Sequence, residues 1–425
     1  MKDVNNMFKK ILSILLISTV LISFSSCNKN SYDFSFFRGA FSPFFALQPE
    51  DISVVDATQE TLLVTQGEAA EFVKNAYTKG VGIADIETEY DADENLVCTV
   101  KLGKDVYFSD GVQMTADDII FSMYVYADPS YEGWSAFCHS DIKGMHNYHY
   151  NLPYADTTEF SEKQIQDALN NPSDELKTLL AQKVVIPVLE EELGWLIRSF
   201  EDKGYKGTEL EEYMKQYPDV KDLFAFLYSI DNNYDSSKAE NAMQVLDDIK
   251  AQYGYDYKTL SKVLGVELIN SAYLCAKEVL LKELDTEPHA NIEKIEGIEK
   301  VDDFTVKVTL TSDDAETFKK VFGIYITPLH YYGDKELYNY EENKFGFTRG
   351  DLTSVKQKDS KPLGAGQYVF NKYNVEKGVS FNVNENYFRT VENPELLYFK
   401  ETCDSSVSLS HSYYVTSDDV TYVEK

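Results

Sequence analysis

The sequence predicts a mixed α/β protein that is interrupted by a block of helices. Three observations support this fold class. Short alternating segments with turn residues occupy residues 37–135, charged helical patterns dominate 136–290, and the alternating pattern returns over 291–400. With 425 residues, of which 43% are hydrophobic, the chain can bury more than one core.

Residues 1–26 have the pattern of an export signal. Two lysines precede an apolar run over 11–24, and two serines follow it. Basic, apolar and small residues in this order are typical of a signal peptide, and the run is shorter than the ~20 residues that span a bilayer. An uncleaved anchor helix is the alternative interpretation.

The signal ends in Phe24-Ser25-Ser26-Cys27, which resembles the lipobox of bacterial lipoproteins. The resemblance implies that the sulfur of Cys27 carries a diacylglycerol and that residues 27–36 form a polar tether. Two or more acyl chains would anchor the protein stably, since each buried methylene contributes ~0.8 kcal/mol. We therefore expect a lipid anchor on the extracytoplasmic face of the cell membrane, in a periplasm or at a cell surface.

Strands and a capped helix are predicted in the first α/β segment. Residues 94–102 and 106–108 alternate as strands do, and an Asp-Gly pair at 110–111 indicates a tight turn. Thr115 is placed to cap the helix that follows, and Asp118 is placed to accept a hydrogen bond from the amide of Thr115, as in a capping box. Asp128-Pro129 should end this helix.

The block over 136–290 reads as a helical insertion in the α/β scaffold. Turn residues separate its predicted helices, which span 162–170, 173–199, 209–216, 220–229, 237–253 and 257–284.

The returning segment again predicts strands and turns. We expect strands over 295–301 and 305–310, a helix over 313–322, a glycine-rich turn over 362–366, and a hairpin of 368–373 with 379–383. The tail over 401–425 is either a final strand pair or a loose end, and its periodicity does not decide between them.

Several of these segments resemble one protein family. Residues 101–111, which end in Phe-Ser-Asp-Gly, and residues 114–122, which begin Met-Thr-Ala-Asp-Asp, are similar to the hallmark of bacterial extracellular solute-binding protein family 5. This family comprises oligopeptide-, dipeptide- and nickel-binding components of ABC importers. Further matching segments follow in the family's order and span 39–45, 326–330, 362–368 and 384–388.

The resemblance implies a periplasmic-binding-protein-like type II fold, in which two lobes enclose a ligand. The implied partners are short peptides and the ABC permease and ATPase subunits, and we expect a monomer without a cofactor. The chain ends soon after Tyr387, so we expect an incomplete second lobe. A half-cleft should bind peptide weakly or not at all, because it cannot exclude water from polar contacts.

The same resemblance implies ligand contacts in two segments. The candidates are Phe41, Ser42, Pro43 and Phe44 in the early loop, and Asn386 and Tyr387 in the late one. Packing of the early aromatic residues under the first sheet, and of Tyr387 in a core, are the alternatives.

Charge and motifs exclude several other functions. A formal charge of −31 disfavours nucleic acid and anionic lipid as partners. Cys98, Cys138, Cys275 and Cys403 are widely spaced and predict buried thiols. Cysteine and histidine gather at 138, 139, 146 and 149, but their spacing matches no closed zinc pattern, so we predict no metal site. Catalytic motifs are absent from the sequence, so we do not expect an enzyme.

Two other functions stay open from the sequence. The chain could be a surface lipoprotein whose helical insertion binds a partner protein, or a fragment without function.

Overall fold

The computed structural model describes residues 39–46, 49–66, 71–133, 135–190, 225, 235–239, 241–374, 378–389, 397–399, 413–416 and 419–422. The chain divides into two compact units. One is helical and includes Glu159–Thr286, and the other is an α/β unit that includes Ser35–Thr158 and Glu287–Lys425. We describe each unit by itself.

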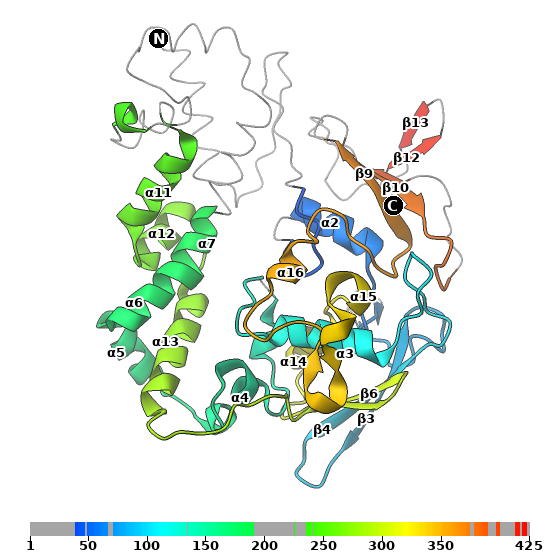
Figure 1. Cartoon of the computed structure of the whole chain (residues 1–425), viewed down its shortest axis with the longest axis horizontal. Helices are drawn as coiled ribbons and strands as arrows, with labels where there is room; N and C mark the ends of the chain where they lie inside the picture. The colour runs from blue at the N-terminus through cyan, green and yellow to red at the C-terminus, as the bar shows by residue number, and fades with distance from the viewer. Residues whose placement is uncertain are drawn as a thin grey trace, which may run out of the picture. The chain divides into compact units, whose positions relative to one another are not determined.

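The α/β unit contains a four-stranded antiparallel sheet, of which β3, β4 and β6 are labelled in Figure 1. Its strands lie in the order β3 (Ala84–Tyr90), β4 (Leu96–Leu102), β6 (Thr305–Leu310) and β5 (Ile298–Asp302). Cys98 lies opposite Val308, which joins the two α/β segments of the sequence in one sheet. The predicted strand pair around residues 302–303 is confirmed, whereas residues 106–108 form only an isolated bridge at Tyr107.

Helix α3 (Ala116–Ala127) packs on this sheet, and nearly all of its residues are buried. The helix begins with the predicted capping box, since the amide of Thr115 donates to the Asp118 carboxylate at 2.8 Å. Its C-cap is Asp128, directly before Pro129, so both predicted ends are confirmed. The core between helix and sheet includes Phe121, Tyr124 and Val308.

A second, five-stranded sheet contains the late segments of the chain, in the order β13-β12-β11-β10-β9. Strands β9 (Tyr368–Asn374) and β10 (Gly378–Val383) form the predicted hairpin, and β11 (Leu397–Phe399) continues the sheet. Strands β12 (Tyr413–Thr416) and β13 (Asp419–Tyr422) pair with each other. Of the two alternatives for the tail, the structure therefore has the final strand pair. Helix α2 (Pro49–Thr58) packs on β9.

Shorter elements complete the α/β unit. They are β1 (Thr65–Gln66), β2 (Glu71–Phe72), η1 (Ala136–His139), α4 (Met145–Tyr150), η2 (Ala155–Thr157), α14 (Ala315–Phe322), α15 (Leu329–Tyr332), η6 (Lys335–Leu337), β7 (Tyr338–Asn339), η7 (Tyr340–Glu342), β8 (Lys344–Phe345) and α16 (Thr353–Lys356).

The helical unit has a hydrophobic core of its own. Its described elements are α5 (Glu162–Asn170), α6 (Asp174–Leu180), the π-helical η3 (Ala181–Val185), α7 (Ile186–Leu189), η5 (Ser236–Lys238), α11 (Ala242–Tyr253), α12 (Tyr257–Leu264) and α13 (Ile269–Leu284). Helices α5 and α6 pack against α13. The predicted helices over 209–216 and 220–229 lie outside the described residues, except for Ala225.

Two expected boundaries differ in the structure. The helical unit begins at Glu159 rather than at residue 136, because Phe137, Met145 and Tyr148 are buried in the core of the α/β unit. The single helix expected over 257–284 is two helices, because Gly265 adopts a left-handed conformation (φ 70°) that ends α12.

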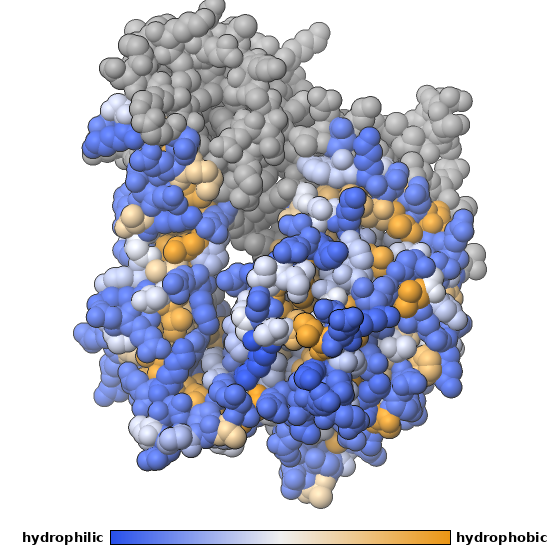
Figure 2. Space-filling view, in the orientation of Figure 1, coloured by the Kyte–Doolittle hydropathy of each residue, from blue (hydrophilic) through white to orange (hydrophobic). Residues whose placement is uncertain are grey.

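The described surface is mostly hydrophilic. On the face drawn in Figure 2, hydrophilic residues predominate over the described part, and hydrophobic residues show as separate spots. None of the described helices is both long and apolar enough to cross a membrane.

Candidate functional site

Four of the motif segments meet in the α/β unit, and this meeting point is the candidate site. The amide of Ser109 donates to the carbonyl of Gly364 at 2.9 Å, and the side chain of Asn386 donates to the carbonyl of Ser109 at 3.1 Å. The Asp110-Gly111 turn uses a positive φ of 85° at Gly111, which a residue with a Cβ rarely adopts. Segments around residues 110, 364 and 386 therefore pack side by side, although they are distant in sequence.

His330 adds the fourth segment to this meeting point. Its Nε2 lies 2.7 Å from Oδ2 of Asp110, and its ring makes an edge contact with the buried Phe108. The side chains of His330 and Asp110 are 17% and 34% exposed, so the pair is partly open to solvent. The Pro-Leu-His segment and the Asp-Gly turn are thus joined by a polar contact.

The buried carboxylate of Asp118 also holds the segment that contains His330. Asp118 Oδ1 accepts a hydrogen bond from the amide of Leu329 at 2.9 Å, while Oδ2 accepts the bond from Thr115. Burial raises the pKa of Asp118 to about 6, although these hydrogen bonds and the nearby His330 oppose the rise. Asp118 therefore links the start of α3 to the start of α15.

The glycine-rich turn lies directly against the end of α2. The amide of Gly366 donates to the carbonyl of Thr58 at 2.9 Å. A Cβ on Gly364 would lie 2.3 Å from that same carbonyl oxygen, so glycine is required by the close approach of two backbones. Asn384 then holds the turn, since its side chain donates to the carbonyl of Gly366 at 2.8 Å.

A charged cluster extends the meeting point towards residue 81. The hydroxyl of Tyr387 donates to Glu60 at 2.9 Å, and Arg389 lies 3.4 Å from the same carboxylate oxygen. The Arg389 guanidinium also donates to the carbonyl of Val81 at 2.9 Å. Burial raises the pKa of Glu60, and the positive charge of Arg389 opposes this rise.

The early-loop candidates are buried. Phe41 packs on Phe370 and Tyr373, with ring centroids 5.4 Å away in each case. Phe44 lies in the main core, 4.9 Å from the ring of Tyr126. Ser42 and Pro43 are buried as well. Packing accounts for the positions of all four residues, and ligand contact by them stays a prediction.

The late-segment candidates are more accessible. Asn386 is exposed and Tyr387 is half-buried, and both hold the meeting point together through their side chains. Their role towards a ligand also stays a prediction. The lipidation candidate, Cys27, lies outside the described residues.

Three of the other cysteines are buried. Cys98, Cys138 and Cys275 are each at most 6% exposed, as predicted for buried thiols. Burial raises the pKa of the Cys98 thiol to about 12 and that of Cys275 to about 11, so both stay protonated at neutral pH. Cys403 lies outside the described residues.

The histidine-rich segment is held by hydrogen bonds. His149 Nδ1 lies 3.0 Å from the carbonyl of Ala127, and the rings of His139 and His149 are 6.0 Å apart. His146 donates its amide to Asp156 at 2.8 Å. Within the described part of the chain, His, Cys, Asp and Glu side chains form no group of three or more that could hold a metal ion.

Sequence reasoning missed two residues of the site and one contact within it. Glu60 and Arg389 lie 329 positions apart in the chain, and no local pattern connects them. The contact between Asp110 and His330 was also unforeseen, although both residues belong to recognised motifs. The one feature of the sequence that pointed to Arg389 was its position directly after the aromatic residues Tyr387 and Phe388.

Comparison with known families agrees with this architecture. The sequence matches the model for bacterial extracellular solute-binding proteins, family 5 (middle part), over residues 84–214 and 219–408. The match spans both α/β segments and most of the chain. The protein belongs to this family of solute-binding proteins, and the predicted mixed α/β fold and family are confirmed.

The solved structures that the chain matches are distant in sequence. NikZ from Campylobacter jejuni, solved with Ni(L-His), is 12% identical and aligns with 86% of this chain and 38% of its own, with a TM-score of 0.36. AppA from Bacillus subtilis, solved with a nonapeptide, is 12% identical over 82% of this chain and 34% of its own, with a TM-score of 0.34. OppA from Haemophilus influenzae, solved with the peptide RPPGFSPFR, is 14% identical over 82% and 37%, with a TM-score of 0.33.

The present chain thus spans between 34% and 38% of the length of these three proteins. A search of curated proteins gives no significant match.

Proposed function

We propose that this protein is the substrate-binding lipoprotein of an ABC importer, and that it captures oligopeptides outside the membrane for delivery to the permease. Its partners would be short peptides and the permease and ATPase subunits, and its role would be binding rather than catalysis. The observation that carries the proposal is the family match, which includes both strand-rich segments of the α/β unit.

The geometry of the meeting point supports this proposal. Hydrogen bonds among backbone groups and amide side chains join segments around residues 109, 364 and 386. Ligand pockets need few polar groups at fixed positions, and a rigid junction of several loops can supply them. We include Asn386 and Tyr387 as candidate ligand contacts, because Asn386 is exposed there and Tyr387 is only half-buried. Phe41, Ser42, Pro43 and Phe44 are further candidates, and they would have to contact a ligand from buried positions.

Docking to the permease is the experiment that tests the proposal. The permease and ATPase subunits, reconstituted in lipid nanodiscs, are immobilised and the purified chain is passed over them. We expect saturable binding, above that of an unrelated protein with a similar negative charge. Binding no stronger than that of the control would refute the transport function and favour a scaffold role for the protein.

Calorimetry against a library of short peptides measures capture directly. We expect saturable binding of some of the peptides, because the proposed function requires this chain to hold them. If no peptide in the library gives a measurable heat of binding, capture of oligopeptides by this chain is refuted.

The proposed lipid anchor at Cys27 has a separate test. Cells that express the chain are labelled with radioactive palmitate, and the C27S variant is the control. We expect label in the membrane fraction for the natural chain and none for C27S, since serine offers no thioether. Equal labelling of the two proteins would refute the anchor without affecting the transport proposal.

A further inference from the structure

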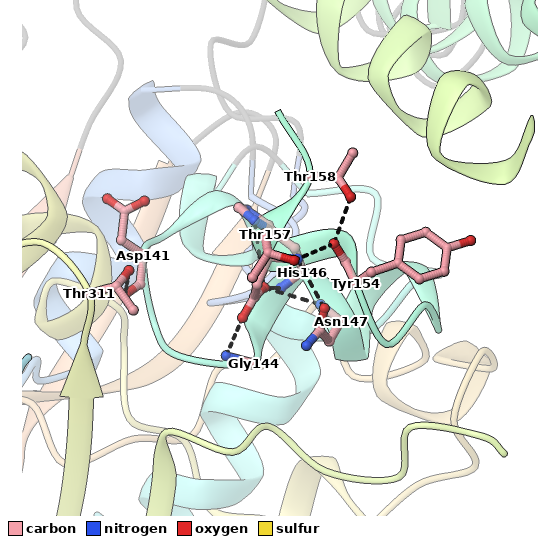
Figure 3. Close-up of polar contacts among 9 residues, drawn as sticks. Asp141, Gly144, His146, Asn147, Tyr154, Thr157, Thr158 and Thr311 are labelled. Carbon is pink, nitrogen blue, oxygen red and sulfur yellow. Dashed lines mark hydrogen bonds and ion pairs between the residues drawn. The ribbon is translucent and has the colours of Figure 1, made fainter. Parts of the chain in front are cut away.

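The segment that leads from the α/β unit to the helical unit is held by the partly buried carboxylate of Asp156. Asp156 accepts hydrogen bonds from the amides of Gly144, His146 and Asn147, the last two at 2.8 and 3.2 Å. Asn147 returns the contact, since its Oδ1 accepts from the amide of Asp156 at 2.9 Å. Figure 3 shows how these groups surround the start of α4, with the hydroxyl of Thr158 bonded to the carbonyl of Tyr154. The outgoing connection is therefore ordered up to its last residue before the helical unit.

The returning connection is held at the same place. Asn151 adopts a left-handed conformation (φ 56°), and its side chain contacts the returning chain twice. Its Oδ1 accepts from the amide of Ile292 at 2.9 Å, and its Nδ2 donates to Asn291 at 3.3 Å. Arg349 also donates to Asn151 Oδ1, at 3.2 Å. Residues near the two ends of the helical unit are thus joined by direct hydrogen bonds within the α/β unit.

Backbone contacts join this junction to the four-stranded sheet. Ile142 forms an isolated antiparallel bridge with Leu310, and the amide of Lys143 donates to the carbonyl of Thr309 at 3.0 Å. The amide of Gly297 donates in turn to the carbonyl of Lys143 at 2.7 Å. We call residues 141–158 and 291–297 the socket. These segments come before and after the helical unit in the chain, and hydrogen bonds hold both of them within the α/β unit.

The two units have separate hydrophobic cores. The helical core contains Leu180, Leu260 and Val279, and the core of the α/β unit contains Val308 and Tyr148, with no described residue in both. The linking residues Glu159, Thr286, Glu287 and Pro288 are exposed to solvent. Cooperative unfolding needs shared buried contacts, and exposed linkers contribute few of them.

We infer that the helical unit, Glu159–Thr286, unfolds as a cooperative module of its own while the socket and the α/β unit stay folded. The inference is independent of the transport proposal, because it rests on the socket contacts and the separate cores. The α/β unit would then stay folded without help from the helical unit.

Hydrogen exchange of the full chain, followed by mass spectrometry, tests this inference. Leu260 is 1% exposed in the helical core, and Val308 is 0% exposed in the other core, so L260A and V308A are a matched pair. A buried Leu→Ala cavity should lower amide protection in α12 and α13 at least about thirtyfold, equivalent to about 2 kcal/mol. We expect protection in α3, β4 and β6 to stay within about threefold of the natural chain.

V308A should give the reverse pattern, with protection lost in α3, β4 and β6 and kept in α12 and α13. Equal loss of protection in both units, for either variant, would overturn the inference, because it would show one cooperative unit. If L260A does not fold, the smaller cavity of V279A gives the same readout.

The socket has its own variant. D156A removes the acceptor of three amides and should expose residues 144–147 to exchange while α13 keeps its protection. Loss of protection in α13 as well would overturn the idea that the socket and the module are separate.

Discussion

Replacing Asp118 with alanine should destabilise the α/β unit, because the carboxylate joins two backbone segments from a buried position. Asp118 is 6% exposed, and it accepts hydrogen bonds from the amides of Thr115 and Leu329. Loss of the capping box costs about 1 kcal/mol, and a buried amide left without an acceptor costs about 1–3 kcal/mol. The expected loss at neutral pH is therefore about 2–4 kcal/mol.

The measurement is hydrogen exchange of the α3 amides in increasing urea, which reports the free energy of unfolding for this unit alone. D303A is the control, because the Asp303 side chain is 79% exposed and its removal should cost no more than about 0.5 kcal/mol. If D118A and D303A unfold at the same urea concentration, the bond to Leu329 does not stabilise the unit as we describe.

The stabilisation by Asp118 should also depend on pH. Its pKa is about 6 in the folded chain, above the ordinary value of 3.8, so the protonated form is favoured by folding. Protonation adds about 3 kcal/mol to the stabilisation that Asp118 provides at neutral pH, and this added part is complete below about pH 4 and is lost as the pH rises through 6. The natural chain should therefore exceed D118A in stability by more at pH 4.5 than at pH 7.5. A difference that is constant or that grows with pH would contradict the assigned burial effect.

Two further variants test the meeting point. G364A should cost several kcal/mol, since its Cβ would lie 2.3 Å from the carbonyl oxygen of Thr58, whereas G350A has open space and should cost only about 1 kcal/mol for its positive φ of 80°. Urea titration of both variants compares them, and equal midpoints would refute the close approach. R389M should cost about 1–3 kcal/mol because it leaves Glu60 buried without its cation, and the double variant R389M/E60Q should recover part of the loss. A double variant that is less stable than R389M would show that the two charges do not act as a pair.

Local features of this fold follow from the sequence, because their partners lie a few residues apart. The capping box needs only Thr115 and Asp118, three positions apart, and the hairpin of β9 and β10 needs only two alternating segments around a short turn. The break at Gly265 was missed because a glycine within an apolar pattern is compatible with a continuous helix. Its left-handed conformation is apparent only once the chain is folded.

Long-range features could not be obtained in this way. Glu60 and Arg389, or Asp110 and His330, carry no spacing that marks them as partners, since their approach depends on the packing of whole segments. The boundary at Glu159 was likewise hidden, because the apolar residues before it have the composition of a helical core but are buried in the other unit. The family motifs identified the segments that meet, whereas the atoms that join them required coordinates.

The bonds from Asn151 to Asn291 and Ile292 have a consequence for how such a chain can change in evolution and in the laboratory. These bonds hold Asn151 close to Asn291 and Ile292. For the strand-rich fold, the whole segment between them is therefore equivalent to one surface loop. The entropy of closing an unstructured loop grows only slowly, by about 0.6 kcal/mol for each doubling of its length. A segment of different length should therefore be tolerated at this position for little cost in loop-closure entropy, and the position is suited to grafting a foreign sequence.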